Sequence, residues 1–489
     1  MSFFRPLIAL IIASVFCQST LAQDEFSEQA VKNDLSVLHM TLQQAHYDLY
    51  AHRSREDYRA LLNDLYGMID GPQSVVDASK IFQRYVAFGK IGHAKTEAGY
   101  VQFIAHIGAG GRFLPIFIRV DGGTVFLVQA ADIDGQTQAG MVIHAINGRS
   151  INSWLNQLGV YVSAERDLMR NSLMEESFAP LLWMELGEVD NVTLTVEGSD
   201  SVKRLIKVDA VDFPGYAAIR AAVPSKSLDT DFNAREYRLL SKGLAYLRPG
   251  PFIDLDTAEV DQRDPSYSGD GFFEFIDQAF EDMIASDATD LIIDLRNNPG
   301  GNNNFSDAMT AWFADKPFRF TNDFRLKASA ATKADYERQL ESGEPDGLLA
   351  DLIEAEMAQP NGMRYSFDIP MVEPRQVHER YKGQVWAIVN RHSYSNATST
   401  AAMIQDYEFG RVFGEETADL PTSYASVLTF ELPETGVVVT YPKSRFLRPS
   451  GNVTMRGVIP DIVLPREPIE SDKDVILEAV SNYVWALRD

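Results

Sequence analysis

The sequence predicts a multi-domain α/β protein with a helical N-terminal region, a small β-rich middle region and a larger C-terminal α/β region. Apolar residues recur at helical spacing over residues 26–90, and short β-rich runs separated by turn signals occupy residues 112–210. From residue 211, near-continuous apolar strands are each followed by a helical pattern. The predicted units are residues 1–22, 23–110, 111–210 and 211–489.

Composition and charge restrict the class of protein. The 489 residues are 45% hydrophobic and 23% charged, which is ordinary for a globular chain and excludes a mainly disordered or multi-spanning one. Asp and Glu outnumber Lys and Arg by 69 to 44, for a formal net charge of −25. An acidic surface repels nucleic acid and anionic membranes, so neither is an expected partner.

Residues 1–22 are predicted to be a signal peptide. Arg5 precedes an apolar run over residues 7–16, and Thr20 and Ala22 are the small residues of a cleavage site. The alternative is an uncleaved anchor, for which this run is too short. We therefore expect an exported protein, periplasmic or extracellular, that does not span a membrane once processed.

Cleavage would also remove Cys17, which is the only cysteine of the chain. The processed protein would then have no disulfide, no thiol nucleophile and no cysteine-based zinc site. Its stability must come from burial of a hydrophobic core, for which the chain is long enough.

The helices of the N-terminal region have recognisable starts. Residues 31–49 carry apolar side chains on one helical face. The segment 54–57 resembles a capping box that opens a second helix, Gly71-Pro72 ends it, and the segment 74–77 repeats the capping pattern.

The middle region begins with runs at 114–120 and 124–129, separated by the hairpin signal Gly122-Gly123. Residues 140–148 read as a buried strand followed by an Asn-Gly turn, and this pattern resembles a PDZ domain. PDZ domains bind extended peptides by adding a strand to a sheet. The alternative is another kind of small β domain.

The C-terminal region has apolar strands at 291–295 and 385–389, as in a sheet covered on both faces. Residues 327–358 form a helical stretch that we interpret as an insertion between strands, and a last helix begins near residue 475.

Two turns at strand ends are candidates for chemistry. The strand 291–295 runs into Asn298-Pro299-Gly300-Gly301, whose backbone N–H groups are positioned to bind an oxyanion. The alternative is an ordinary turn. This turn lacks the Lys and Ser/Thr of a phosphate-binding loop, so a nucleotide is not expected.

The second turn, residues 390–398, lies between the strand 385–389 and a helix that starts near Ala397. At such an elbow Ser395 meets the helix N-terminus, whose positive dipole end favours a developing alkoxide. The alternative is that Ser395 only caps the helix.

Together the two turns resemble the C-terminal processing (tail-specific) serine peptidase family. The family's strand-end motif matches residues 294–301, and its serine elbow followed by a helix ending in Gln-Asp matches residues 393–406. Gly414-Glu415-Glu416-Thr417 and the segment 457–461 match two later motifs. The resemblance implies Ser395 as the nucleophile, a crotonase-like layered catalytic domain, a peptide or unfolded-protein substrate, and no metal or organic cofactor.

The choice of base depends on which branch of the family is resembled. One branch uses a lysine about 25 residues after the serine, but this chain has Leu420 there and no lysine between Lys382 and Lys443. The tricorn-core-like branch uses a histidine from the N-terminal segment, which matches His93 after Gly92. His392 is a second-choice base, and the alternative for His93 is an ordinary buried histidine.

The remaining site residues follow from the same resemblance. The N–H groups of Asn396 and of Gly300 or Gly301 are the expected oxyanion hole. The tricorn-like pattern adds a serine, here Gly92, and a late glutamate, here Thr454, so the group that orients the histidine is open. Candidate orienting groups are Asp406, Glu415 and Glu416.

These observations predict an exported serine-type endopeptidase with Ser395 as nucleophile and His93 as general base. Two alternatives remain at this stage. One is a catalytically weak or inactive family member that binds peptides or other ligands. The other is an ester or thioester hydrolase on the same scaffold.

Overall fold

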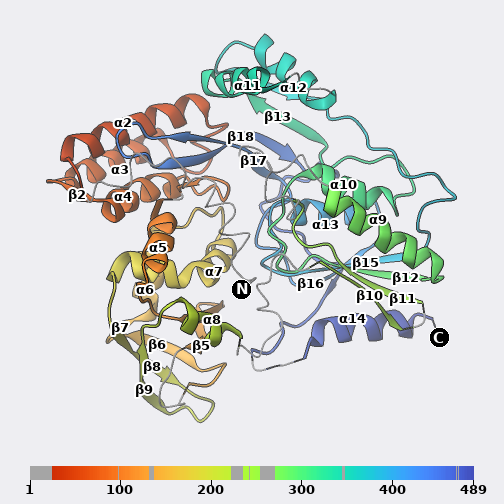
Figure 1. The fold of residues 1–489 in the computed structure, drawn as a ribbon, viewed down its shortest axis with the longest axis horizontal. Coiled ribbons are helices and arrows are strands. Elements are labelled where there is room, and N and C mark those ends of the chain that lie inside the picture. Colours follow the sequence, from red (N-terminus) through yellow and green to blue (C-terminus); the bar gives the residue numbers. More distant parts are fainter. Residues whose placement is uncertain are drawn as a thin grey trace.

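The structure is a computed structural model that describes residues 25–96, 98–130, 137–221, 235–241, 243–253, 270–343, 347–469, 471 and 473–488. The predicted signal peptide lies outside these residues. In Figure 1 three lobes are visible: helices with a β-arm at the upper left, a small sheet at the lower left and a layered α/β unit on the right.

The N-terminal lobe consists of the predicted helices. Each of its first three helices begins at a serine whose hydroxyl accepts an N–H of the first turn: Ser27, Ser54 and Ser74. The capping box predicted at Ser54 is confirmed. The elements are β1 (Glu25–Phe26), α2 (Glu28–Ala45), α3 (Arg55–Met68), β2 (Gln73–Ser74), α4 (Val75–Phe88), β3 (Lys95–Thr96) and α5 (Ala98–Gly108).

The core of this lobe is completed by a segment more than 300 residues later in the chain. Val439 and Tyr441 of the late β-arm are buried against the apolar faces of α2, α3 and α4. The buried carboxylate of Asp34 in α2 accepts N–H bonds from Glu434 (3.0 Å) and Thr435 (2.8 Å) at the tip of that arm. The N-terminal helices are therefore not packed on one another alone.

The middle lobe is built on an antiparallel sheet with the order β4-β5-β6-β8-β9, in which β7 pairs with β6. The strands predicted here are confirmed, with ends shifted by a residue or two. The 20-residue helix α7 packs against β4 and was not predicted; Pro180 lies within it. The elements are β4 (Ile116–Asp121), β5 (Thr124–Ala130), β6 (Val142–Ile146), β7 (Arg149–Ser150), α6 (Ile151–Leu158), a 3₁₀ turn (Gly159–Tyr161), α7 (Asp167–Leu186), β8 (Asn191–Glu197), β9 (Lys203–Asp209) and α8 (Phe213–Ala221).

The C-terminal lobe contains a sheet with the order β10-β11-β12-β15-β16-β19, parallel from β11 onward. One face packs against α9, α10 and α13, and the other against α14, so the predicted two-sided cover is confirmed. The elements are β10 (Glu236–Ser241), β11 (Leu244–Arg248), α9 (Asp270–Ala285), β12 (Asp290–Asp294), α10 (Asn303–Ala311), β15 (Gln384–Val389), α13 (Asn396–Asp406), β16 (Arg411–Gly414), β19 (Ile462–Val463) and α14 (Val475–Ala486).

A second sheet, with the order β14-β13-β18-β17, forms the arm that reaches the N-terminal helices, and β3 pairs with β18. The stretch 327–358 forms two helices between β13 and β14, as predicted for an insertion. The elements are β13 (Asp323–Lys327), α11 (Ala330–Ser342), α12 (Gly347–Ala358), β14 (Arg364–Phe367), β17 (Ser423–Glu431) and β18 (Val438–Leu447).

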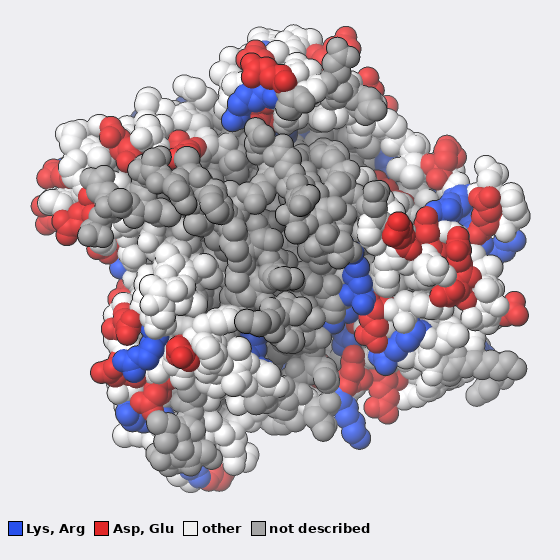
Figure 2. All heavy atoms as spheres, viewed as in Figure 1, with Lys and Arg blue, Asp and Glu red and all other residues white. Residues whose placement is uncertain are grey.

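On the face drawn in Figure 2, red and blue side chains lie interspersed along the described periphery. Among the described helices, none combines the length and the apolar character needed to cross a bilayer.

Candidate active site

The two turns singled out in the sequence lie side by side because the strands before them are parallel neighbours. Asp294 at the end of β12 is opposite Ile388 in β15. The Tyr394 N–H donates to the Asn298 carbonyl at 2.9 Å, and the Ser393 hydroxyl donates to the Leu295 carbonyl at 2.7 Å. These bonds join the glycine turn and the serine turn into one unit.

Ser395 lies at the junction of this unit and α13 in a strained conformation. Its φ of 51° and ψ of −120° are unusual for a residue with a side chain. Ser395 occupies the N-cap position of α13, but its hydroxyl accepts no capping hydrogen bond from that helix. Gly300 makes the close approach possible: a Cβ there would lie 2.7 Å from Ser395 Cβ and 2.6 Å from Asn396 N.

The turn after α4 brings His93 to this serine. His93 Nε2 lies 3.2 Å from Ser395 Oγ, across 302 residues of sequence. The ring stacks on Tyr394, with 5.1 Å between centroids, and the Tyr394 hydroxyl donates to the Gly92 carbonyl at 3.1 Å. Within the described residues, His93 Nδ1 is buried without a hydrogen-bond partner. Stacking and the Ser395 contact therefore hold the ring.

The electrostatic setting of His93 favours its neutral form. Burial lowers the pKa of His93 from its usual 6.5, the charge of Lys95 lowers it further, and the carboxylate of Asp419 opposes both effects. A neutral imidazole is the form that can accept a proton from a hydroxyl.

Of the three expected oxyanion donors, the structure leaves two available. The Gly300 N–H already donates to the Asn298 side chain at 2.9 Å, so the prediction of Gly300 as an oxyanion donor is wrong. The role of Gly300 is to leave space for Ser395 and Asn396. The N–H groups of Gly301 and Asn396 have no acceptor in the part of the chain that the structure describes. The Asn396 side chain, bonded to the Asn302 carbonyl at 2.9 Å, fixes the start of α13.

None of the three carboxyl groups predicted to orient the histidine contacts it, so those predictions are wrong. Asp406 pairs with Arg448 at 2.6 Å. Glu415 and Glu416 pair with other arginines, and Glu416 also accepts the Gly457 N–H at 3.0 Å. Because each carboxylate is satisfied by a guanidinium, these residues stabilise loops around the site.

The carboxyl group that does lie beside the pair is Asp419, which the sequence analysis did not identify. Asp419 is 2% exposed, and its Oδ2 accepts the Ser395 N–H at 2.6 Å. The loop that carries it follows the Gly414–Thr417 motif, and the Thr417 hydroxyl donates to the Asp419 carbonyl at 2.9 Å. The Gly414–Thr417 motif was the sequence signal nearest to Asp419. Its spacing alone does not show where the Asp419 side chain, two residues after the motif, points.

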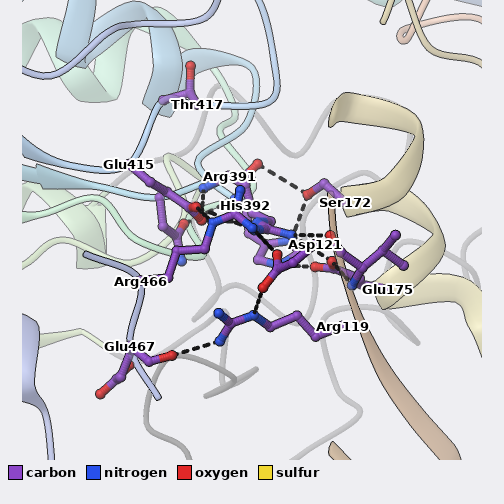
Figure 3. Close-up of polar contacts among 12 residues, drawn as sticks. Arg119, Asp121, Ser172, Glu175, Arg391, His392, Glu415, Thr417, Arg466 and Glu467 are labelled. Carbon is purple, nitrogen blue, oxygen red and sulfur yellow. Dashed lines mark hydrogen bonds and ion pairs between the residues drawn. The ribbon is translucent and has the colours of Figure 1, made fainter. Parts of the chain in front are cut away.

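His392, the second-choice base, is held away from Ser395. Its Nε2 lies 3.1 Å from Glu175 (Figure 3) and its Nδ1 lies 2.9 Å from Glu176, and both glutamates belong to α7. Although burial lowers it, the hydrogen bonds to these carboxylates raise the pKa of His392 to about 10. At neutral pH this histidine is therefore protonated and unable to act as a base.

Arg391, next to it, joins the serine turn to the edge of the middle sheet. Its guanidinium bonds to Glu175 at 2.7 Å and to Asp121 at 2.6 Å, as Figure 3 shows. It also donates to the Val120 carbonyl at 3.0 Å, while the Val120 N–H donates to Glu175 at 2.7 Å. The backbone N–H and carbonyl groups of Val120, on the β4 edge of the sheet, are thus both hydrogen-bonded. A peptide that paired with β4 at Val120 would have to displace Arg391.

Replacing Arg391 by methionine is expected to lower the free energy of unfolding by about 3 kcal/mol. The Arg391 and Glu175 side chains are each 3% exposed. The substitution would remove the guanidinium that donates to the carboxylates of Glu175 and Asp121. A buried carboxylate without a partner is costly. Urea unfolding followed by tryptophan fluorescence measures the loss.

Arg466→Met is the matched control, because Arg466 pairs with the same Asp121 but its side chain is 36% exposed. An exposed pair contributes at most about 1 kcal/mol. Equal losses for the two variants would show that burial of Arg391 does not determine its contribution.

Within the described ranges, no group of three or more His, Cys, Asp or Glu side chains is arranged to hold a metal ion.

Sequence comparisons match parts of the chain to known peptidases. Residues 268–464 match the sequence model of peptidase family S41. A tail-specific protease of Haemophilus influenzae (strain ATCC 51907 / DSM 11121 / KW20 / Rd) is 28% identical over 150 residues, which cover 26% of this chain and 21% of the relative. The match thus spans about a fifth of that relative's length, and over residues 268–464 the chain is similar to peptidases of family S41.

Solved structures show the same mixed α/β fold over nearly the whole chain. Mature CPAF is similar with a TM-score of 0.63 at 16% identity, covering 94% of this chain and 98% of CPAF. A mutant of CPAF gives a TM-score of 0.64 at 15% identity, covering 93% and 96%. At these identities the similarity concerns the fold.

Proposed function

We propose that this chain is an exported serine-type endopeptidase of the tail-specific kind, with Ser395 as nucleophile and His93 as general base. The observation that carries the proposal is the 3.2 Å distance between His93 Nε2 and Ser395 Oγ. That is a hydrogen-bond distance between a buried imidazole and a strained serine at a helix N-terminus, which is the arrangement of an activated nucleophile. The match of residues 268–464 to peptidase family S41 supports peptide hydrolysis as the reaction.

The arrangement suits acyl transfer from a peptide. Ser395 Oγ attacks the peptide carbonyl carbon while His93 Nε2 takes the hydroxyl proton. The N–H groups of Gly301 and Asn396 stabilise the negative oxygen that forms. His93 then gives its proton to the leaving amine as the C–N bond breaks. Water attacks the acyl-enzyme while His93 takes a proton from it, and that proton returns to Ser395 Oγ as the carboxylic acid product leaves. All these steps use groups of this chain and need no cofactor.

A fluorophosphonate probe and a peptide substrate test this proposal together. We expect the wild-type protein to react covalently with the probe at Ser395, and probe treatment to stop cleavage of an unfolded protein such as denatured casein. Peptide mapping identifies the modified residue. Cleavage of p-nitrophenyl esters without any cleavage of casein would instead favour an ester hydrolase, and absence of labelling would favour a binding protein.

The proposal that the protein is exported rests on the sequence of residues 1–22. We expect the secreted or periplasmic protein to begin at Gln23, because Thr20 and Ala22 are the small residues that a signal peptidase accepts. N-terminal sequencing of protein from the periplasm or the medium measures this. Ala22→Leu is the control and should block processing, whereas mature protein that begins at Met1 would contradict the proposal.

A further inference from the structure

Two buried carboxyl groups lie beside the Ser395–His93 pair and have no part in the mechanism above. Asp419 comes from the loop after β16, and Glu165 from the segment just before α7. Both act on the two reacting residues through backbone N–H groups: Asp419 on that of Ser395, and Glu165 on that of Gly92, beside His93. The charge of Asp419 disfavours ionisation of Glu165, so the protonation states of the two groups must be considered together.

Asp419 has the contacts of an ionised carboxylate. Burial raises the pKa of Asp419, but the charge of His93 opposes this effect. The carboxylate also accepts the Ser395 N–H at 2.6 Å and a second backbone N–H from Leu420, and hydrogen bonds to the charged form favour that form. Its loop is also fixed: the Thr417 hydroxyl donates to the Asp419 carbonyl at 2.9 Å, and Arg166 donates to the Thr417 carbonyl at 2.8 Å. The negative charge is therefore held close to His93.

Glu165 has the contacts of a neutral acid. Its Oε1 accepts the Gly92 N–H at 3.1 Å, but its buried Oε2 has no hydrogen-bond partner in the described part of the chain. The adjacent Arg166 pairs with Glu416 instead. A buried anion with an unpaired oxygen is costly, and burial together with the charge of Asp419 raises the pKa of Glu165 to about 8.

We propose that Asp419 and Glu165 are the positioning residues of this site, with Asp419 as the anion that steadies Ser395 and protonated His93, and Glu165 as a neutral acid that holds the His93 turn. This inference rests on the proposed Ser395–His93 mechanism and supplies the acidic groups that Asp406, Glu415 and Glu416 do not provide. The groups that face His93 are Asp419, Lys95 and Tyr394. Of these three, Asp419 alone carries a charge that stabilises an imidazolium.

Asp419→Asn tests the charge, because the amide oxygen can still accept the Ser395 N–H. We expect kcat to fall on the order of 10²-fold with KM little changed, since the loss concerns the protonated histidine and not substrate binding. The acid limb of the rate profile should also move to lower pH. The reason is that the Asp419 charge raises the pKa of His93, and its removal lets that pKa fall. A merely structural role would leave this limb in place.

Glu165→Gln is the matched variant, because glutamine is neutral and its oxygen can still accept the Gly92 N–H. We expect it to keep kcat within about threefold of wild type, whereas Glu165→Ala, which lacks the acceptor, should lower kcat by on the order of tenfold. A loss in Glu165→Gln as large as that in Asp419→Asn would show that Glu165 acts as an anion and overturn the assignment.

Two further readings separate this inference from the proposed function. If the wild-type protein does not react with the fluorophosphonate probe, the proposed function fails and the division of roles fails with it. If the wild type reacts and Asp419→Asn reacts equally fast with an unmoved acid limb, only the inference fails. Circular dichroism and thermal unfolding check that each variant folds. If Asp419→Asn does not fold, the Glu165→Gln variant still tests the inference. Its kcat must stay within about threefold of the wild-type value, and a larger fall in kcat would overturn the inference.

Discussion

Replacement of Ser395 by alanine is expected to abolish covalent labelling and to lower kcat by about 10⁶-fold, because the nucleophile is lost and only binding and the oxyanion hole remain. The protein should still fold. The Ser395 hydroxyl has its hydrogen bond with His93, and its backbone is held by Asp419, neither of which the core requires. Intact-mass spectrometry after treatment with a fluorophosphonate measures labelling, and casein digestion measures turnover.

Ser393→Ala is the control from the same turn. The Ser393 side chain is fully buried, donates to the Leu295 carbonyl at 2.7 Å and accepts the Asn390 N–H at 3.1 Å. Its loss should therefore reduce the unfolding free energy by about 1–3 kcal/mol while labelling at Ser395 persists. If Ser395→Ala is labelled as strongly as the wild type, the nucleophile is another residue.

Much of the fold could be predicted because its signals are local. Serine caps at residues 54 and 74 and the apolar runs at 291–295 and 385–389 depend on neighbouring residues, and the structure has these elements. The packing of the β17–β18 arm on the N-terminal helices could not be predicted, since apolar periodicity shows that a face is buried but not what covers it. The long helix α7 was missed in the same region that the pattern described as β-rich.

The residues of the candidate site also divide into those that could be predicted and those that could not. Ser395 and the glycine turn each follow a strand, and because these two strands are parallel neighbours the turns lie side by side. The contact of His93 with Ser395 came from a family resemblance, because no periodicity links residues 302 positions apart. Asp419 was missed because its direction depends on a loop fixed by Arg166 and Thr417, and a sequence pattern does not encode such tertiary hydrogen bonds.

The predictions of the orienting acids were wrong for a related physical reason. Asp406, Glu415 and Glu416 lie within the sequence motifs that resemble the family, but each pairs with an arginine from another segment of the chain. Charge pairing between distant segments is set by the three-dimensional arrangement of loops. A motif therefore locates a turn more reliably than it identifies the side chain that faces the reaction.

Replacement of His93 by alanine is expected to lower kcat by roughly 10³-fold or more, because the general base and acid is removed while the oxyanion donors remain. Substrate affinity should change little, since His93 acts on a proton. In the wild type, kcat/KM should rise with pH to a plateau, with a midpoint below the usual histidine value of ~6.5. The midpoint lies below that value because burial lowers the pKa of His93, so the imidazole stays neutral at lower pH.

His392→Gln under identical conditions is the deciding comparison. His392 is protonated at neutral pH through its bonds to Glu175 and Glu176, and it lies in the charged cluster of Figure 3 and not at Ser395. We expect this variant to lose stability but to keep turnover within about threefold of wild type and the same acid limb. If it is inactive while His93→Ala turns over normally, the base is the local histidine. If both variants keep wild-type turnover, the Ser–His mechanism must be abandoned, because no other base in the described site lies at hydrogen-bond distance from Ser395 Oγ.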